Sequence, residues 1–251
     1  MVDLHCHILP GIDDGAQSVE DSIDLLNAQR RQRVRSVMLT PHFNFERTDI
    51  KSFCDRRANA LKLLTEKQEF ADADITVKTG AEVFFSVKLN EEDLDPLCFE
   101  GTNYILIELP VNSRPYGLTH TLRALTNRGY IPILAHVERY PYIADDPTVL
   151  YDLVMDGCLA QVNAGSIIKN NERSAMAMKY LKWELAQVIS SDAHSMKKRP
   201  PNIKPAMSVI ENKLGSQYTK WLEKNSEDIF MGRYVDLPVL KKPKKFFGVW
   251  R

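Results

Sequence analysis

Short runs of apolar residues alternate along the chain with longer stretches in which apolar and polar positions recur at helical spacing. The apolar runs are at most ten residues long, and most are rich in Val, Ile or Leu, as buried β-strands are. They predict strands at residues 1–5, 35–40, 75–84, 103–109, 131–135, 159–163 and 187–191. The amphipathic stretches predict helices near residues 18–32, 49–68, 86–94, 116–128, 146–156, 170–183 and 203–224.

Local signals support several of the predicted helix ends. Ser18 is suited to be the N-cap of the first helix, with Asp21 three residues later and Glu20 in the first turn. Gly129 and Gly157 follow the fourth and fifth helices, where a glycine commonly ends a helix. Strand and helix alternate seven times, which predicts a parallel α/β fold, either a barrel or an open doubly wound sheet.

Length and composition allow one large globular domain or two small ones, and the seven strand–helix units, which use almost the whole chain, favour one. The chain has 251 residues, of which 44% are hydrophobic and 26% charged, and α/β barrels of about 250 residues commonly form a single domain. We therefore expect a barrel over residues 1–240 and a short basic, aromatic tail over residues 241–251. The 33 basic residues balance the 33 acidic ones, which argues against a nucleic-acid-binding protein.

The cysteines and the lack of long apolar runs suggest a reduced, cytoplasmic protein. Cys6, Cys54, Cys98 and Cys158 include no C-x-x-C pair, so neither a disulfide framework nor a structural zinc site is indicated. No apolar run reaches the length of a membrane span, about 18 residues, and the first residues lack the features of a signal peptide.

The same cysteines exclude one class of phosphatase. A thiol-based tyrosine phosphatase needs a Cys-x5-Arg motif, in which the thiolate attacks while the arginine holds the phosphate. The residues six positions after the four cysteines are Ile12, Ala60, Tyr104 and Ala164, none of them an arginine. We therefore expect no phosphocysteine intermediate, and we expect Cys6 to point into the core.

Histidines and carboxylates gather where the predicted strands end. Five of the six histidines lie at or just after a strand's C-terminal end: His5, His7, His42, His136 and His194. Glu82, Glu108 and Asp192 occupy equivalent positions, whereas His120 lies within a predicted helix. In parallel α/β folds these strand ends meet on one face, which carries the active site. We therefore expect the eight strand-end side chains to converge.

Their chemistry predicts a metal centre. His5 and His7 lie two residues apart in a strand, so both imidazoles can bind the same ion. Imidazoles and carboxylates without thiolates suit Mn²⁺, Fe²⁺ or Zn²⁺, and this many ligands implies two or three ions. Clustered divalent ions are the usual apparatus for displacement at phosphorus. Even with one aspartate of the pair Asp13–Asp14 added, three ions would leave a net positive pocket suited to a phosphate dianion.

Five segments resemble a known family. They are MVDLHCHILPGIDDGA at 1–16, TPH at 40–42, GAEV at 80–83, AHVERY at 135–140 and SDAH at 191–194. Together they resemble the polymerase and histidinol phosphatase (PHP) superfamily. More narrowly, HCHILPGIDDG with HVERY is similar to the metal-dependent protein-tyrosine phosphatases of Gram-positive capsule and exopolysaccharide gene clusters.

The resemblance implies a distorted (β/α)7 TIM-like barrel whose strand C-termini hold a trinuclear site. The family's metal ligands correspond to His5, His7, Asp14, His42, Glu82, Glu108, His136, Asp192 and His194. The motif selects Asp14 over Asp13, a choice that residue chemistry alone leaves open. The ions would be three divalent metals, usually Mn²⁺, with Fe²⁺ or Zn²⁺ as alternatives.

The reaction implied by the resemblance is hydrolysis of phosphotyrosine by a metal-bound hydroxide. Arg139, Asp14 and His42 would be catalytic, and Arg139 and Arg199 would bind the phosphate. The implied substrate is a membrane-associated tyrosine kinase that regulates capsular or exopolysaccharide synthesis. We expect the protein not to bind nucleic acid, and to contact a membrane at most peripherally, through its basic tail.

Other functions remain open at this point. A small-molecule phosphatase similar to histidinol phosphatase would differ only in the shape of its pocket. A metal-binding scaffold without activity would be expected to lack some ligands, whereas all nine positions are occupied. A metal-dependent exonuclease is disfavoured by the neutral charge, and an amidohydrolase by Glu82 and Glu108 in place of a bridging lysine. The aromatic residues Tyr116, Tyr140, Tyr142, Phe43 and Phe45 are candidates for a wall beside the pocket.

Overall fold

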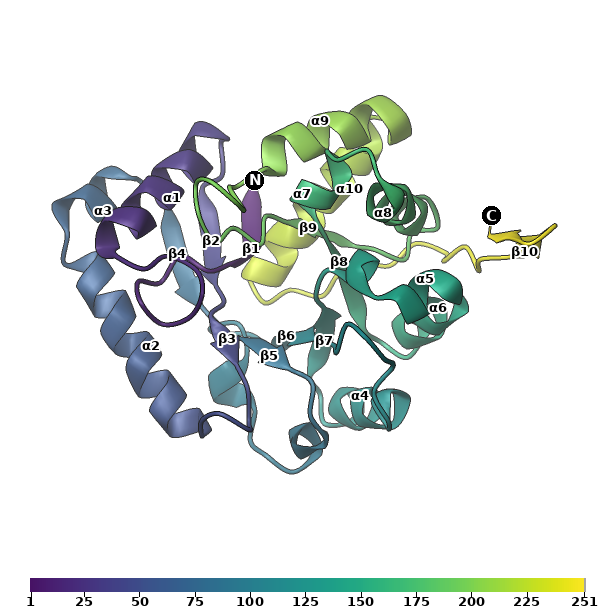
Figure 1. The fold of residues 1–251 in the computed structure, drawn as a ribbon, viewed down its shortest axis with the longest axis horizontal. Helices are drawn as coiled ribbons and strands as arrows, with labels where there is room; N and C mark the ends of the chain where they lie inside the picture. The colour runs from purple at the N-terminus through teal and green to yellow at the C-terminus, as the bar shows by residue number, and fades with distance from the viewer. Residues whose placement is uncertain (251) are drawn as a thin grey trace.

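A ring of parallel strands forms the centre of the structure, a computed structural model that describes residues 1–250 (Figure 1). The strands are β1 (Val2–Cys6), β2 (Ser36–Leu39), β3 (His42–Phe43), β4 (Thr76–Thr79), β5 (Glu82–Phe84), β6 (Tyr104–Glu108), β7 (Ile131–Leu134), β8 (Leu159–Asn163) and β9 (Val188–Ser190). They pair in parallel in the orders β1–β2–β4 and β3–β5–β6–β7–β8–β9.

Two of the barrel strands are each interrupted once. The predicted strand 35–40 is β2, and β3 continues it after Pro41, which has no N–H to donate to a neighbouring strand. The predicted strand 75–84 divides into β4 and β5 at Gly80. Backbone hydrogen bonds from Gly80 to Leu39 (2.9 Å) and from Glu82 to Pro41 (3.0 Å) carry the pairing across both interruptions.

Hydrogen bonds after β9 close the sheet into a barrel. The amide of Asp192 donates to the carbonyl of His5 (2.8 Å), and the amide of His7 donates to the carbonyl of Ala193 (2.9 Å). These bonds join the last strand to the first, so the fold is the distorted barrel and not the open sheet that the hydrophobic pattern also allowed.

Helices surround the barrel (Figure 1). They are α1 (Val19–Arg31), α2 (Ile50–Thr65), α3 (Gln68–Asp72), α4 (Leu118–Asn127), α5 (Pro141–Asp145), α6 (Thr148–Met155), α7 (Ala164–Ile167), α8 (Glu172–Lys182), α9 (Ile203–Leu214) and α10 (Ser216–Phe230). Short 3₁₀ turns are η1 (Val87–Asn90), η2 (Asp95–Leu97) and η3 (Val137–Arg139). The Ser18 side chain caps α1 by accepting from Asp21 N at 3.1 Å, as predicted.

Two helix predictions are wrong in detail. Residues 86–94 do not form an α-helix but the turn η1, which Ser86 caps and which leads to Pro96 in η2. Residues 203–224 do not form one helix, because Gly215 adopts a φ of 91° and separates α9 from α10. An L-residue rarely adopts that conformation, so the glycine permits the sharp reversal.

The apolar residues form two clusters on either side of the barrel wall. The inner cluster fills the barrel with side chains that include Leu4, Leu106 and Ile133, and it contains Phe230 of α10. The hydroxyl of Tyr104, the first residue of β6, donates to the carbonyl of Arg233 just after α10 at 2.8 Å, so this helix ends at the lower end of the barrel, where the strands begin. The outer cluster lies between the strands and the surrounding helices. Since the lower end is filled by apolar side chains, the polar site lies at the opposite end, where the strands finish.

The C-terminal residues leave the barrel and run along its outside (Figure 1). A small antiparallel hairpin forms from β10 (Lys245–Phe246) and β11 (Val249–Trp250). Trp250 Nε1 donates to the carbonyl of Asp145 at 3.0 Å, and Lys241 pairs with Glu184 at 3.2 Å. Within residues 1–250, we find no helix long and apolar enough to span a membrane.

Candidate metal centre

The strand C-termini bring the nine predicted ligand residues to one mouth of the barrel. Three overlapping groups have ligand atoms within 4.8 Å of one another: His5, His7 and Asp192; His7, Asp14, His42 and His194; and His42, Glu82 and Glu108. His136 joins them because its Nε2 lies 2.9 Å from Glu82 Oε1 and 3.7 Å from Glu108 Oε1. His120 is exposed on α4 and belongs to none of these groups.

An irregularity in β1 turns its two histidines toward the mouth. The register between β1 and β2 shifts between Asp3 and Cys6. Leu4 belongs to the inner cluster, whereas Cys6, two residues later and at the end of this interval, belongs to the outer one. Such a bulge re-aims the side chains that follow it, which explains why His5 and His7 face the mouth while Cys6 faces the core, as predicted.

The spacing of the ligand atoms is that of groups sharing an ion. His5 Nε2 and His7 Nε2 are 3.1 Å apart, and Glu82 Oε2 is 3.2 Å from each. Neighbouring ligands on one ion stand about 3 Å apart when the metal–ligand bonds are about 2.1 Å long. In the described part of the chain, Glu82 Oε2, Asp192 Oδ1 and His194 Nε2 are buried without a hydrogen-bond partner. Buried atoms of this kind normally have a partner, so a set of divalent cations fits them.

Hydrogen bonds to the far side of each imidazole orient the rings. His5 Nδ1 donates to Gln161 Oε1 at 3.1 Å, and His7 Nδ1 donates to Asp13 Oδ2 at 2.8 Å. His194 Nδ1 donates to the carbonyl of Asp192 at 3.0 Å. Each bond leaves Nε2 directed into the cluster, which is the usual arrangement around histidine ligands.

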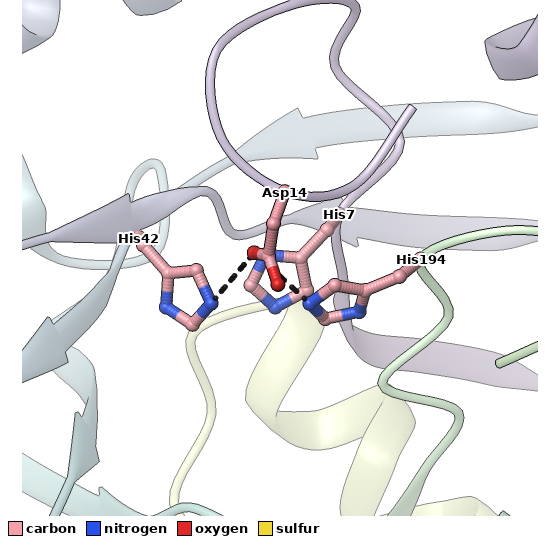
Figure 2. A group of neighbouring side chains, drawn as sticks. All are labelled: His7, Asp14, His42 and His194. Carbon is pink, nitrogen blue, oxygen red and sulfur yellow. Dashed lines mark ion pairs between the residues drawn. The ribbon is translucent and has the colours of Figure 1, made fainter. Parts of the chain in front are cut away.

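Asp13 and Asp14 have different environments. Asp14 is 68% exposed, and its Oδ1 lies 3.2 Å from His42 Nε2 and 3.5 Å from His194 Nε2 (Figure 2). Asp13 is only 5% exposed and points the other way, toward His7 Nδ1 and the amides of Gly15 and His42. The geometry therefore suits Asp14 as a ligand and Asp13 as the residue that positions His7.

Glu82 and Asp192 are held in their ionised form, whereas burial and the charge of Glu82 raise the pKa of Glu108. Burial opposes the ionisation of Glu82, but the charge of His5 and a hydrogen bond from His136 hold its pKa well below the usual range. Burial likewise opposes the ionisation of Asp192, but the charges of His5 and Arg139 lower its pKa. Ionised carboxylates are the form that binds cations.

His194 is held neutral. Burial and the charge of His7 lower the pKa of His194 to about 3. Because its Nδ1 carries the proton donated to Asp192, its Nε2 presents a free electron pair to the cluster. This is the form in which an imidazole binds a metal.

Unusual backbone conformations accompany the site. His136 and Asp192 have φ values of 34° and 52°, which non-glycine residues rarely adopt and which cluster at functional sites. Gly15 supports the 13–14 loop by close packing, since a Cβ at this position would stand 2.1 Å from the carbonyl oxygen of His7.

Arg139 and Arg199 meet beside the cluster. Arg139 Nη2 donates to Asp192 Oδ2 at 2.7 Å, and Arg199 Nη2 pairs with the same oxygen. Burial lowers the pKa of Arg139, but the charge of Asp192 outweighs burial and raises it. The side chains of Arg139 and Arg199 are 25% and 35% exposed, so both are partly accessible to solvent.

Sequence reasoning missed two residues of β8, the one predicted strand without a candidate ligand. Gln161 Oε1 accepts from both His5 Nδ1 and the amide of His136, and Asn163 Nδ2 donates to Asp192 Oδ2 at 2.7 Å. Gln161 Nε2 donates to Asn163 Oδ1 at 2.7 Å, which joins the two supports. The sequence signal that could have identified them is their polarity within the otherwise apolar run 159–163.

Two of the five aromatic residues expected beside the pocket do not form a wall there. Tyr140 and Phe43 are buried in the core. The Tyr140 hydroxyl accepts from the amide of Leu109 at 2.9 Å and lies 3.3 Å from His136 Nδ1, so it supports that ring. Tyr116 is exposed.

The thiols lack the features of a catalytic nucleophile. Burial raises the pKa of Cys6 well above its usual value and raises the pKa of Cys98 and Cys158 to about 12. Cys54, which is partly exposed, also has its pKa raised by burial. A reactive cysteine needs a lowered pKa.

Known proteins match this chain over most of its length. Residues 1–231 match the family described as capsular polysaccharide synthesis, CpsB/CapC. The tyrosine-protein phosphatase YwqE of Bacillus subtilis is 32% identical over 260 residues, covering 99% of both chains. The tyrosine-protein phosphatase CpsB of Streptococcus pneumoniae is 30% identical over 237 residues, covering 88% of this chain and 94% of that protein.

The fold is also similar to a solved structure. A crystal structure from work on YwqE of Bacillus subtilis and CpsB of Streptococcus pneumoniae, described as unique metal-dependent tyrosine phosphatases, superposes with a TM-score of 0.86. It is 30% identical and covers 97% of this chain and 100% of its own. These similarities confirm the resemblance drawn from the sequence motifs, and the chain belongs to the CpsB/CapC family of capsular polysaccharide synthesis proteins.

Proposed function

We propose that this protein is a metal-dependent phosphatase that removes the phosphate from phosphotyrosine in proteins. The observation that carries the proposal is the cluster of histidines and carboxylates at the barrel mouth, with two arginines at its edge. The relatives named as tyrosine-protein phosphatases align with most of this chain, which supports the same substrate class here.

The three overlapping ligand groups would hold up to three divalent ions, Mn²⁺ with Fe²⁺ or Zn²⁺ as alternatives. When bound, such ions would lower the pKa of a coordinated water to about 7 and so supply the hydroxide nucleophile at neutral pH. Glu82 and Asp192 are placed to contribute negative charge from inside the cluster, and Asp14 contributes it from the solvent side.

The arginines would hold the phosphate. Arg139 and Arg199 both point at Asp192 Oδ2, directly beside the cluster. Their N–H groups can donate to the non-bridging phosphate oxygens, where negative charge is concentrated during transfer. The leaving tyrosine needs little assistance, since the pKa of a phenol is about 10.

The physiological substrate we propose is a membrane-associated tyrosine kinase that regulates capsular or exopolysaccharide synthesis, dephosphorylated in the cytoplasm. The family's described role in capsular polysaccharide synthesis supports this choice. A tyrosine kinase phosphorylates its own chain or a partner's, and a phosphatase of the same system would return it to the unphosphorylated state.

Turnover and metal content measured together test the proposal. We expect hydrolysis of a phosphotyrosine peptide that EDTA abolishes, that Mn²⁺ restores and that thiol alkylation leaves unchanged. His194→Ala should lower both metal content and turnover, whereas the matched control His120→Ala, at an exposed position on α4, should change neither.

Three results would contradict the proposal. Peptide hydrolysis that survives complete metal removal would refute the metal mechanism. A clear preference for histidinol phosphate would indicate a small-molecule phosphatase. Full metal loading without turnover of either compound would indicate a scaffold.

A further inference from the structure

A pocket lies beside the metal cluster, and Asp192, Arg139 and Arg199 line the part of it next to the cluster. It has a volume of about 140 Å³ and is formed by the segment after β8 and the loop after His194. Since a water molecule occupies about 30 Å³ in the liquid, the pocket has room for a phosphate or carboxylate group together with a few waters.

Positive charge dominates this pocket. Its cationic lining residues are Arg139, Lys169, Arg173, Lys198 and Arg199, and Asp192 is the one carboxylate among the described residues that line it. The polar side chains of Ser166, Asn171 and Asn202 add neutral hydrogen-bonding groups. The chain as a whole has a formal net charge of +0, so this concentration of cations is local.

Three of the cations have no intramolecular role. The side chains of Lys169, Arg173 and Lys198 are exposed and form no hydrogen bond or ion pair with any residue from 1 to 250. The one carboxylate of the pocket is already bonded by Arg139, Arg199 and Asn163. An anion entering from solvent would therefore meet cations that are not neutralised.

Asp192 joins the pocket to the cluster. Its Oδ1 lies 3.4 Å from His5 Nε2 and 3.5 Å from His7 Nε2, while its Oδ2 accepts from the two arginines that line the pocket. A phosphate held at the cluster by Arg139 and Arg199 would leave Lys169, Arg173 and Lys198 of the same pocket for a second anion. An extended peptide advances about 3.3 Å per residue, so two anionic side chains a few residues apart can reach both places.

We propose that the part of this pocket formed by Lys169, Arg173 and Lys198 is an anion subsite that binds the phosphate or carboxylate of a residue close to the hydrolysed phosphotyrosine in the same peptide. The inference rests on the proposed function and adds a substrate class to it. The preferred substrates are segments in which phosphotyrosine has a second phosphotyrosine, or Asp or Glu, within a few residues.

Matched peptides and variants test the subsite. One phosphotyrosine peptide carries neutral neighbours, a second carries Asp and Glu, and a third carries a second phosphotyrosine. The triple variant Lys169→Ala, Arg173→Ala, Lys198→Ala removes the unpaired cations. Its control, Lys67→Ala, Lys213→Ala, Lys220→Ala, removes the same charge from exposed positions that do not line the pocket.

We expect wild type to favour the anionic peptides over the neutral one in kcat/KM by about tenfold at low salt, mainly through KM, given the usual strength of three exposed charge pairs. The preference should diminish at about 0.5 M salt, because screening weakens exposed charges. The triple variant should lose the preference while keeping wild-type rates on the neutral peptide and on p-nitrophenyl phosphate. The control variant should behave as wild type.

The two anionic peptides identify the source of the ligand. A gain for the doubly phosphorylated peptide alone assigns the subsite to a second phosphate, and a gain for both assigns it to anions in general. Equal kcat/KM for all three peptides, or a triple variant that keeps the wild-type preference, would overturn the proposal.

A binding assay separates this inference from the proposed function. Fluorescence anisotropy with peptides carrying a non-hydrolysable phosphonate should show the same preference and the same loss in the triple variant, whether or not turnover occurs. If no phosphotyrosine peptide is hydrolysed with metal present, the proposed function fails while the binding data still decide on the subsite. Binding that does not depend on the three cations would refute the subsite alone.

Discussion

The same substitution, aspartate to asparagine, should mainly lower the stability of the metal-free protein at Asp13 and mainly weaken metal binding at Asp14. Asp13 Oδ2 accepts from His7 Nδ1 (2.8 Å) and the amide of His42 (3.0 Å), and its Oδ1 accepts from the amide of Gly15 (2.9 Å). An asparagine has only one acceptor oxygen, so in Asp13→Asn at least one of these donors faces an N–H group. Asp14 is largely exposed, and Asp14→Asn strands no buried donor.

The magnitudes follow from these contacts. Leaving one buried donor unsatisfied and weakening a charge-assisted bond should destabilise the metal-free Asp13→Asn protein by about 2–4 kcal/mol. For a domain of this size that corresponds to a melting temperature lower by about 5–15 °C. Asp14→Asn should change metal-free stability by no more than about 0.5 kcal/mol and should weaken metal binding directly, because it alters a candidate ligand.

Thermal unfolding in EDTA and calorimetric Mn²⁺ titration measure the two effects. Burial opposes the ionisation of Asp13, but its bonds to His7 lower its pKa. The stability it contributes is therefore present above the unfolded pKa of about 3.9 and is lost as pH falls below it. The difference between wild type and Asp13→Asn should shrink below about pH 4. It should also shrink as pH rises above about 6.5, because burial opposes the protonation of His7 but its bonds to Asp13 and Glu82 raise its pKa to about 10, and that contribution is lost over this range. Unchanged metal-free unfolding in Asp13→Asn, or a large loss in Asp14→Asn, would refute the assignment of roles.

Three further substitutions probe the rest of the site. Arg139→Ala should lower kcat by about 10²–10³ while metal content stays at the wild-type level; wild-type kinetics would exclude a role in phosphate binding. Gln161→Leu removes the oxygen shared by His5 and the amide of His136, and should weaken Mn²⁺ binding by about 10–100-fold with turnover recovering at saturating metal. Unaltered Mn²⁺ affinity would show that Gln161 does not orient the ligands. Gly15→Ala should displace the 13–14 loop and lose most activity, since its Cβ has no room beside His7. The exposed control Gly101→Ala, whose Cβ meets no atom within 4 Å, should keep activity despite some backbone strain. Equal activity in the two variants would contradict the packing argument.

Much of the fold could be predicted because its signals are local. Apolar runs and amphipathic stretches are read over a few residues, and the Ser18 cap and the Gly129 and Gly157 stops all appear as expected. The failure at 86–94 has a local cause as well, since Ser86 and Pro96 favour short turns that still bury Leu89 and Leu97. The break at Gly215 was visible as a glycine, but its φ of 91° was not.

The candidate ligands were predictable for a different reason. His5, His7 and Asp192 carry side chains whose chemistry is recognisable without a structure, and their position at strand ends places them on one face of any parallel α/β fold. Gln161 and Asn163 contact those candidate ligands through neutral amide groups. Amides are common in proteins, so their presence in the sequence does not by itself indicate a metal site. Their role appears only when His5 and Asp192 are seen beside them.

The sequence by itself therefore determined the strand–helix alternation, the family and the candidate ligands at the strand ends, because periodicity, capping and motif spacing are properties of neighbouring residues. Only the tertiary structure decided that the sheet closes, that Asp13 positions while Asp14 faces the cluster, and that five cations surround one pocket beside Asp192. Those features depend on contacts between residues far apart in the chain, such as His5 with Asp192 and Arg139 with Arg199, and folding alone brings such residues together.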